Sequence, residues 1–130
     1  MTDGLTLLGS VTRGSITAAE LETFDAPPTV AEVRFVTEEL TALCPITSQP
    51  DLYTMTLQYV PKRLCLESKA LKLYLHGYRD RGVFAEALAA QILADIVAVL
   101  NPVTAAVKLQ QQVRGGLALT ATAIHEGDPA

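Results

Sequence analysis

A thiol and a carboxylic acid lie at the two ends of a stretch of the sequence that is expected to form a loop. Cys44 precedes Pro45, and Asp51 follows Pro50 seven residues further on. A thiolate is a strong nucleophile, and a carboxylic acid can protonate the atom that becomes basic when a thiol adds to a polar multiple bond. The two residues therefore form a minimal set for such an addition. The ordinary alternatives are a small buried residue for Cys44 and a turn residue for Asp51.

A second group of charges lies in a segment expected to be helical. Glu67 precedes Lys69 and Lys72, and helical residues three apart point the same way. Two ammonium groups on one face can bind phosphates, and Arg114, beside a Gly-Gly turn, can join them. The ordinary alternative is a solvated helix face.

A third candidate is Glu86, near the start of another helical segment. At about 100° per residue, Gln91 and Asp95 lie roughly 140° and 180° from it, so Glu86 borders the apolar face. A carboxylate there can accept hydrogen bonds from the ring N–H and amino group of a purine-like ligand. It can equally serve only to stabilise the start of the helix.

The composition describes one acidic domain with an aliphatic core. The chain has 130 residues, of which 49% are hydrophobic and 5% aromatic. Charged residues are only 18%, and contact between subunits is the expected cover for the remaining surface. The net charge of −4 argues against a nucleic-acid partner.

Neither a membrane span nor a metal site is expected. The longest apolar stretch, 83–100, is interrupted by polar residues, as in a buried helix. The first residues lack a signal-peptide pattern, so we expect a cytoplasmic protein with free thiols, Cys65 lying in the core. His76 and His125 are too few and too far apart for a zinc site.

The periodicity of apolar residues gives the element order ββααββ. Alternation predicts strands and three- to four-residue spacing predicts helices, at 31–36, 53–59, 67–76, 83–100, 105–110 and 117–122. This order indicates an α+β fold, a four-stranded antiparallel sheet with two helices on one face. Residues 1–28 are expected to form a surface arm and 29–130 the catalytic domain. Open sheet edges favour assembly into a ring.

Five segments of the sequence form a recognisable set of motifs. They are Leu-Cys-Pro-Ile-Thr-Ser-Gln-Pro-Asp at 43–51, Tyr-Val-Pro at 59–61, Glu-Ser-Lys-Ala-Leu-Lys-Leu-Tyr at 67–74, Phe-Ala-Glu at 84–86 and Arg-Gly-Gly at 114–116. Together they resemble the NADPH-dependent 7-cyano-7-deazaguanine reductases (QueF), the nitrile reductases of queuosine synthesis. The likeness extends from about Leu21 to Leu119, with the motifs in family order.

The resemblance implies a tunnelling fold (T-fold), whose subunits form a homo-oligomeric ring with active sites between subunits. It also implies that Cys44 attacks the nitrile carbon to give a thioimide, that Asp51 protonates the nitrogen, and that two NADPH complete the reduction. The implied substrate is a small deazapurine, with no nucleic acid, membrane or metal involved. Substrate-binding positions would be Leu66, Glu67, Ser68, Ala85 and Glu86, and NADPH-binding positions Lys69, Lys72 and Arg114.

Three positions depart from the family pattern. Ala85 replaces a usual histidine that seats the substrate and carries protons, Ser48 replaces a glycine, and Ala70 replaces a serine. Two alternatives to reduction therefore stay open. One is a related amidinotransferase, in which ammonia captures the thioimide; the other is a silent deazapurine-binding protein.

Overall fold

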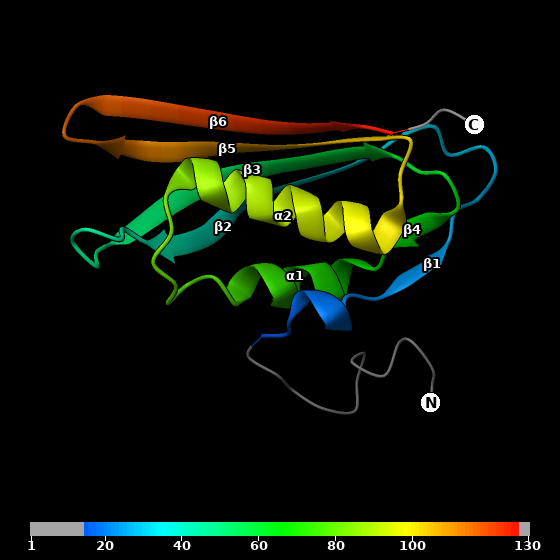
Figure 1. Cartoon of the computed structure of the whole chain (residues 1–130), viewed down its shortest axis with the longest axis horizontal. Helices are drawn as coiled ribbons and strands as arrows, with labels where there is room; N and C mark the ends of the chain where they lie inside the picture. The colour runs from blue at the N-terminus through cyan, green and yellow to red at the C-terminus, as the bar shows by residue number, and fades with distance from the viewer. Residues whose placement is uncertain (1–14, 128–130) are drawn as a thin grey trace.

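A computed structural model describes residues 15–127 of the chain (Figure 1). The elements are a 3₁₀ turn η1 (Ala18–Glu20), strands β1 (Thr23–Asp25), β2 (Val33–Leu43), β3 (Pro50–Val60) and β4 (Leu64–Leu66), helices α1 (Ser68–His76) and α2 (Ala85–Leu100), and strands β5 (Thr104–Arg114) and β6 (Leu117–Glu126).

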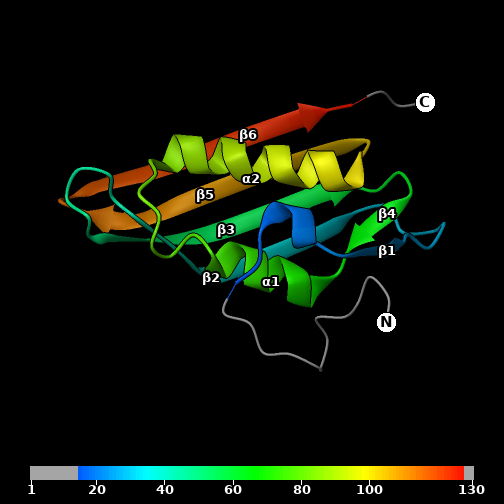
Figure 2. The same cartoon turned by 60° about the horizontal axis from the view of Figure 1, so that its bottom comes forward.

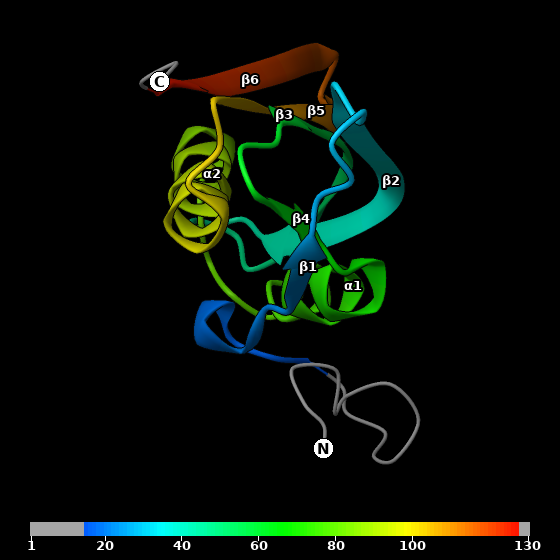
Figure 3. The same ribbon diagram turned by 90° about the vertical axis from the view of Figure 1, so that its right-hand side faces the viewer.

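The main sheet is antiparallel, with the strand order β2-β3-β5-β6. Figure 3 shows both helices on the same face of this sheet, and Figure 2 shows α2 lying along it. The predicted α+β architecture and ββααββ order are confirmed. A second, two-stranded sheet of β1 and β4 was not predicted, because strands of three residues carry too little alternation to be recognised.

The core lies between the sheet and the helices. The predicted inward face of β3 is confirmed, since Tyr53, Met55, Leu57 and Tyr59 are at most 2% exposed. Aliphatic side chains of α2 and β5 complete the core, among them Leu88, Ile92, Ile96, Val107 and Leu109. All four tyrosines of the chain are buried, so the aliphatic core carries several hydroxyl groups that need partners.

The β2 strand is longer than predicted. It continues beyond residue 36 to Leu43, and its pairing with β3 shifts between Thr37 and Leu40. Between these positions β2 has one more residue than β3, which is a β-bulge. The bulge reverses the alternation at Glu38 and Glu39, so periodicity alone ended the strand too early.

The β5–β6 hairpin is confirmed at the predicted paired glycines, although both strands extend further than predicted. Gly115 and Gly116 have φ values of 57° and 78°, as a tight two-residue hairpin turn requires. A register shift between Gln111 and Arg114 precedes the turn. This register shift and the glycine turn together set the position of Arg114 at the end of β5.

The predicted arm lies partly outside the described residues, which begin at 15, and the domain boundary at 28 stays a prediction. Its described part packs on this chain: Ile16 is 6% exposed, and Thr23 pairs with Leu66. Within residues 15–127, no helix is both long and apolar enough to cross a membrane.

Candidate active site

Cys44 begins a tight loop between β2 and β3. Its backbone N–H donates to Gln49 O at 2.8 Å, and its carbonyl accepts from Ser48 N at 2.8 Å. Ser48 has a φ of 61°, so this serine adopts the left-handed conformation that favours glycine. The loop is therefore closed by its own backbone, and it holds the thiol half-buried at the end of the sheet.

The loop stabilises the thiolate form of Cys44. Hydrogen bonds from the Thr47 side chain, and then from the backbone at Thr47 and Ile46, lower the pKa of Cys44 below its ordinary value. Burial and the Asp51 charge act in the opposite direction but do not outweigh them. A lowered pKa is what a nucleophilic cysteine needs. Sequence reasoning missed Thr47, whose contribution depends on the closed loop.

Asp51, by contrast, is a buried carboxylate, 6% exposed, on β3. Arg114 forms an ion pair with it through Nη1 and Oδ1. The same guanidinium donates to Pro50 O at 3.2 Å and to Gln49 Oε1 at 2.8 Å. Arg114 thus connects the β5–β6 hairpin to the Cys44 loop. The predicted role of Arg114 in cofactor binding is untested, but the structure places it beside Asp51.

The start of α2 lies at the same end of the molecule. Leu43 N donates to Arg81 O at 2.8 Å, and Val83 N donates to Leu43 O at 3.0 Å, so the segment before α2 pairs with the residue before Cys44. Ala85 is buried and Glu86 is exposed in the first turn of α2. The structure therefore brings Cys44, Asp51, Ala85, Glu86 and Arg114 to one end of the subunit, which we call the cysteine end.

Glu67 occupies the opposite end, where it caps α1. Its Oε1 accepts from Ala70 N at 2.8 Å and its Oε2 from Lys69 N at 2.9 Å. Ala70, which replaces the usual serine, is fully buried. Alanine has no side-chain polar group, so none is left unpaired at this position. Leu66 is buried and Ser68 is exposed beside this cap. We call the segment from Leu66 to Lys72 the lysine end.

Both lysines of this segment are exposed, and among residues 15–127 neither ammonium pairs with a carboxylate. Lys72 and Ser68 line a groove of about 700 Å³ between α1 and β2. Apolar side chains such as Phe35 and Leu40 form much of its remaining wall. A mixed groove with a free cation suits a ligand that has both a flat apolar part and phosphates.

The two ends are far apart within one chain. Tyr59 Oη accepts a hydrogen bond from Leu66 N at 2.9 Å, which fixes the lysine end to the last part of β3. Asp51 lies eight residues earlier on this strand, which corresponds to roughly 26 Å. Figure 1 shows the same separation between the β2–β3 loop and β4. The predicted residues therefore form two clusters, and one chain does not bring them together.

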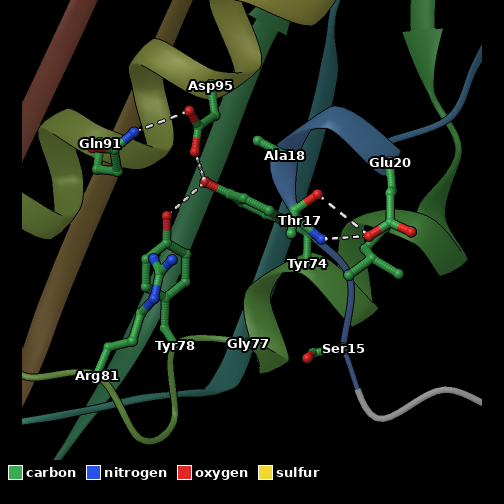
Figure 4. A pocket seen from close by; sticks show the side chains of 11 residues that line it. Ser15, Thr17, Ala18, Glu20, Tyr74, Gly77, Tyr78, Arg81, Gln91 and Asp95 are labelled. Carbon is green, nitrogen blue, oxygen red and sulfur yellow. Dashed lines mark hydrogen bonds between the residues drawn. The ribbon is translucent and has the colours of Figure 1, made fainter.

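A second cavity, of about 490 Å³, lies between η1, α1 and α2 (Figure 4). Tyr74 Oη donates to Asp95 Oδ2 at 2.5 Å and lies 2.8 Å from Tyr78 Oη. Asp95 also accepts from Gln91 Nε2 at 3.0 Å. Asp95, which the sequence places about 180° from Glu86 around α2, is half-buried against α1. These polar groups satisfy one another, which indicates a structural link between the helices.

Both cysteines are free thiols, and Cys65 is 4% exposed in the core, as predicted. Within the described part of the chain, no three histidine, cysteine, aspartate or glutamate side chains gather into a metal-binding group. The expected absence of a metal stays a prediction.

Comparisons with known proteins point to one family. Residues 50–129 match the family described as QueF-like protein. The NADPH-dependent 7-cyano-7-deazaguanine reductase of Halorhodospira halophila is 46% identical over 109 residues, which cover 82% of this chain and 92% of the relative. The enzyme of the same name from Frankia casuarinae is 45% identical over 105 residues, covering 81% and 84%.

Among solved structures, the archaeosine synthase QueF-Like in its apo form has a similar fold. The TM-score is 0.69 at 25% sequence identity, and the match covers 78% of this chain and 99% of that one. The shared fold agrees with the α+β architecture predicted from the element order and with the tunnelling fold that the family resemblance implied.

Proposed function

Since this chain belongs to the family of QueF-like proteins, we propose that it reduces the nitrile of 7-cyano-7-deazaguanine to an aminomethyl group, a step of queuosine synthesis. The observation that carries this proposal is the Cys44 loop, which lowers the pKa of the thiol and holds it near the buried carboxylate of Asp51. A stabilised thiolate close to a carboxylic group is suited to addition across a carbon–nitrogen triple bond.

The proposed chemistry begins at Cys44. Its sulfur forms a bond to the nitrile carbon and one C–N π bond breaks, so that the nitrogen needs a proton. Asp51, a carboxylate paired with Arg114, can accept the proton that the Cys44 thiol gives up and pass it to this nitrogen. The product of this step is a thioimide. Two NADPH, bound one after the other, would supply the two hydrides that conversion of a nitrile to an amine requires. After the first hydride, the C–S bond breaks to give an imine and returns the Cys44 thiol; the imine then takes the second hydride and a proton to give the amine.

The groove at the lysine end fits the phosphates of such a cofactor. Lys72 lines it, and Lys69 is exposed nearby on α1. Arg114 belongs to the cysteine end, so it can join the two lysines only where the cysteine end of one copy meets the lysine end of another. We therefore propose a homo-oligomer in which each active site combines Cys44 of one copy with Glu67 and the lysines of a second copy.

NADPH oxidation tests this function. Purified protein is mixed with 7-cyano-7-deazaguanine and NADPH, and the amine product is quantified in the same reaction. We expect two NADPH consumed per amine formed. A folded, oligomeric protein that oxidises no NADPH would contradict the proposal. An amidine formed on adding ammonia would instead identify an amidinotransferase, the activity that Ala85 leaves open.

A further inference from the structure

Tyr53 has a buried hydroxyl without a partner. The residue is 2% exposed on the inward face of β3, and its Oη makes no hydrogen bond within the described residues. The other three tyrosines differ, since Tyr59, Tyr74 and Tyr78 each have a hydrogen-bonded hydroxyl. A buried hydroxyl without a partner costs about 1–3 kcal/mol, and phenylalanine would fill the same space without that cost. Such a group calls for a partner that is absent from the free chain.

The surroundings of Tyr53 indicate which partner this is. Tyr53 lies two residues after Asp51 on the same face of β3, and it pairs with Leu40 of β2 and Gln111 of β5. After burial, the charges of Asp51, Glu86 and Cys44 are the causes that raise the pKa of Tyr53, to about 12. All three belong to the cysteine end. The phenol therefore stays protonated at neutral pH, and it can donate a hydrogen bond among the groups proposed to hold the ligand.

Protein groups do not offer a ready alternative partner. Asp51, the charge that acts most strongly on Tyr53, accepts from Arg114 but from no Tyr53 hydroxyl, and Glu86 is exposed at the start of α2. Ala85, the buried residue next to Glu86, has no side-chain polar group. The Tyr53 hydroxyl can thus donate a hydrogen bond to a bound ligand from the side of the site that the sheet forms.

We infer that Tyr53 is a ligand-positioning residue, whose buried hydroxyl donates a hydrogen bond to the deazapurine nitrile held between Cys44 and Glu86. This inference rests on the proposed function, because that function supplies the ligand. It adds a residue that neither the sequence motifs nor the comparisons assign.

The test compares Tyr53→Phe with Tyr74→Phe in a Cys44→Ala background, where no covalent bond forms. The measured quantities are Tm and the Kd for 7-cyano-7-deazaguanine by isothermal titration calorimetry. For Tyr53→Phe we expect an equal or higher Tm and a Kd raised roughly ten- to a hundredfold. For Tyr74→Phe we expect the reverse, a lower Tm and an unchanged Kd, because its hydroxyl donates to Asp95.

An unchanged Kd for Tyr53→Phe, or a Tm several degrees below that of the parent, would overturn the inference. An unchanged Kd would mean that the Tyr53 hydroxyl does not contact the ligand. A lowered Tm would mean that this hydroxyl has a partner within the protein. Failure of the proposed function is separate, since it would appear as absent NADPH oxidation in the protein with Cys44 and Tyr53 intact. A parent protein that does not bind the nitrile at all would overturn both.

Discussion

At the residue scale, the thiol of Cys44 differs from an ordinary cysteine because Thr47 and the backbone at Ile46 donate hydrogen bonds to it. Thr47 Oγ1 also accepts a hydrogen bond from Gln49 N at 3.2 Å, so the hydroxyl is held in place within the loop. The nucleophile thus depends on the closed loop as much as on the cysteine itself.

Replacing Thr47 by valine should raise the pKa of Cys44. Because the folded protein lowers this pKa, the alkylation rate of Cys44 by iodoacetamide should reach half its maximum below pH 9.0, the ordinary value for a thiol. In Thr47→Val the midpoint should move to higher pH, since the largest stabilising hydrogen bond is lost. The measurement uses a Cys65→Ala background, with Thr54→Val on β3 as control. An equal midpoint in both variants would show that Thr47 does not stabilise the thiolate.

Ser48 offers a test of the loop conformation. Its φ of 61° is accessible to serine but disfavours a β-branched side chain. We expect Ser48→Gly to keep or raise the free energy of unfolding and Ser48→Val to lower it by about 1–2 kcal/mol. Urea denaturation of both variants measures this difference. Equal stability of the two would mean that the loop does not hold residue 48 in the left-handed conformation.

The sequence could propose candidate residues, which stay predictions, but it could not predict the contacts that these residues make in the structure. Cys44 and Asp51 were identified from residue type and spacing. The contact of Arg114 with Asp51 joins positions 63 residues apart. It depends on the register shift and the turn that end β5, and neither follows from local periodicity.

At the element scale, tyrosine hydroxyls connect the layers of the fold. Tyr59 joins β3 to β4, and Tyr74 joins α1 to Asp95 of α2. The long apolar run of α2 and the alternation of β3 predicted these elements well. The tyrosine contacts between them were not predicted, because a helical or strand pattern shows only that a side chain faces inward.

These buried phenols should make the protein sensitive to alkali. Burial raises the pKa of Tyr59 and of Tyr53 from 10.0 to about 12. Between these values the unfolded chain has lost protons that the folded chain retains, so stability is complete below about pH 10 and falls as the pH rises towards 12. Urea denaturation at several pH values measures the decline, which should be shallower in Tyr59→Phe. A stability that stays constant from pH 9 to 12 would contradict this assignment.

At the scale of the whole molecule, the main sheet has two unpaired edges within residues 15–127, and the predicted site residues lie in two separate clusters. β2 and β6 are the edge strands of the main sheet, and apolar residues on both are exposed, Val36 by 60% and Ile124 by 65%. Exposed apolar edges favour pairing with another copy. The fold could be predicted from the element order. The separation of the two clusters could not be predicted, because it depends on the length of β3 and on the contact between Tyr59 of β3 and Leu66 of β4.

A mixture of two inactive variants tests the divided site. Cys44→Ala lacks the nucleophile, and a Lys69→Ala, Lys72→Ala double variant lacks the cofactor cations while retaining its fold, because both lysines are exposed. If each site combines the ends of two copies, subunits exchanged at equal amounts should recover about a quarter of the parent activity. Activity is measured as NADPH oxidation before and after subunit exchange. No recovery after proven exchange would mean that each site lies within one chain.

The central claim is that Cys44 captures the nitrile, and the mass of the intact chain tests it most directly. The protein is incubated with 7-cyano-7-deazaguanine without NADPH, alongside Cys44→Ala and Cys65→Ala. We predict a mass increase of one ligand in the parent and in Cys65→Ala, and none in Cys44→Ala. An unmodified parent chain, or an adduct that persists in Cys44→Ala, would contradict this account of the site.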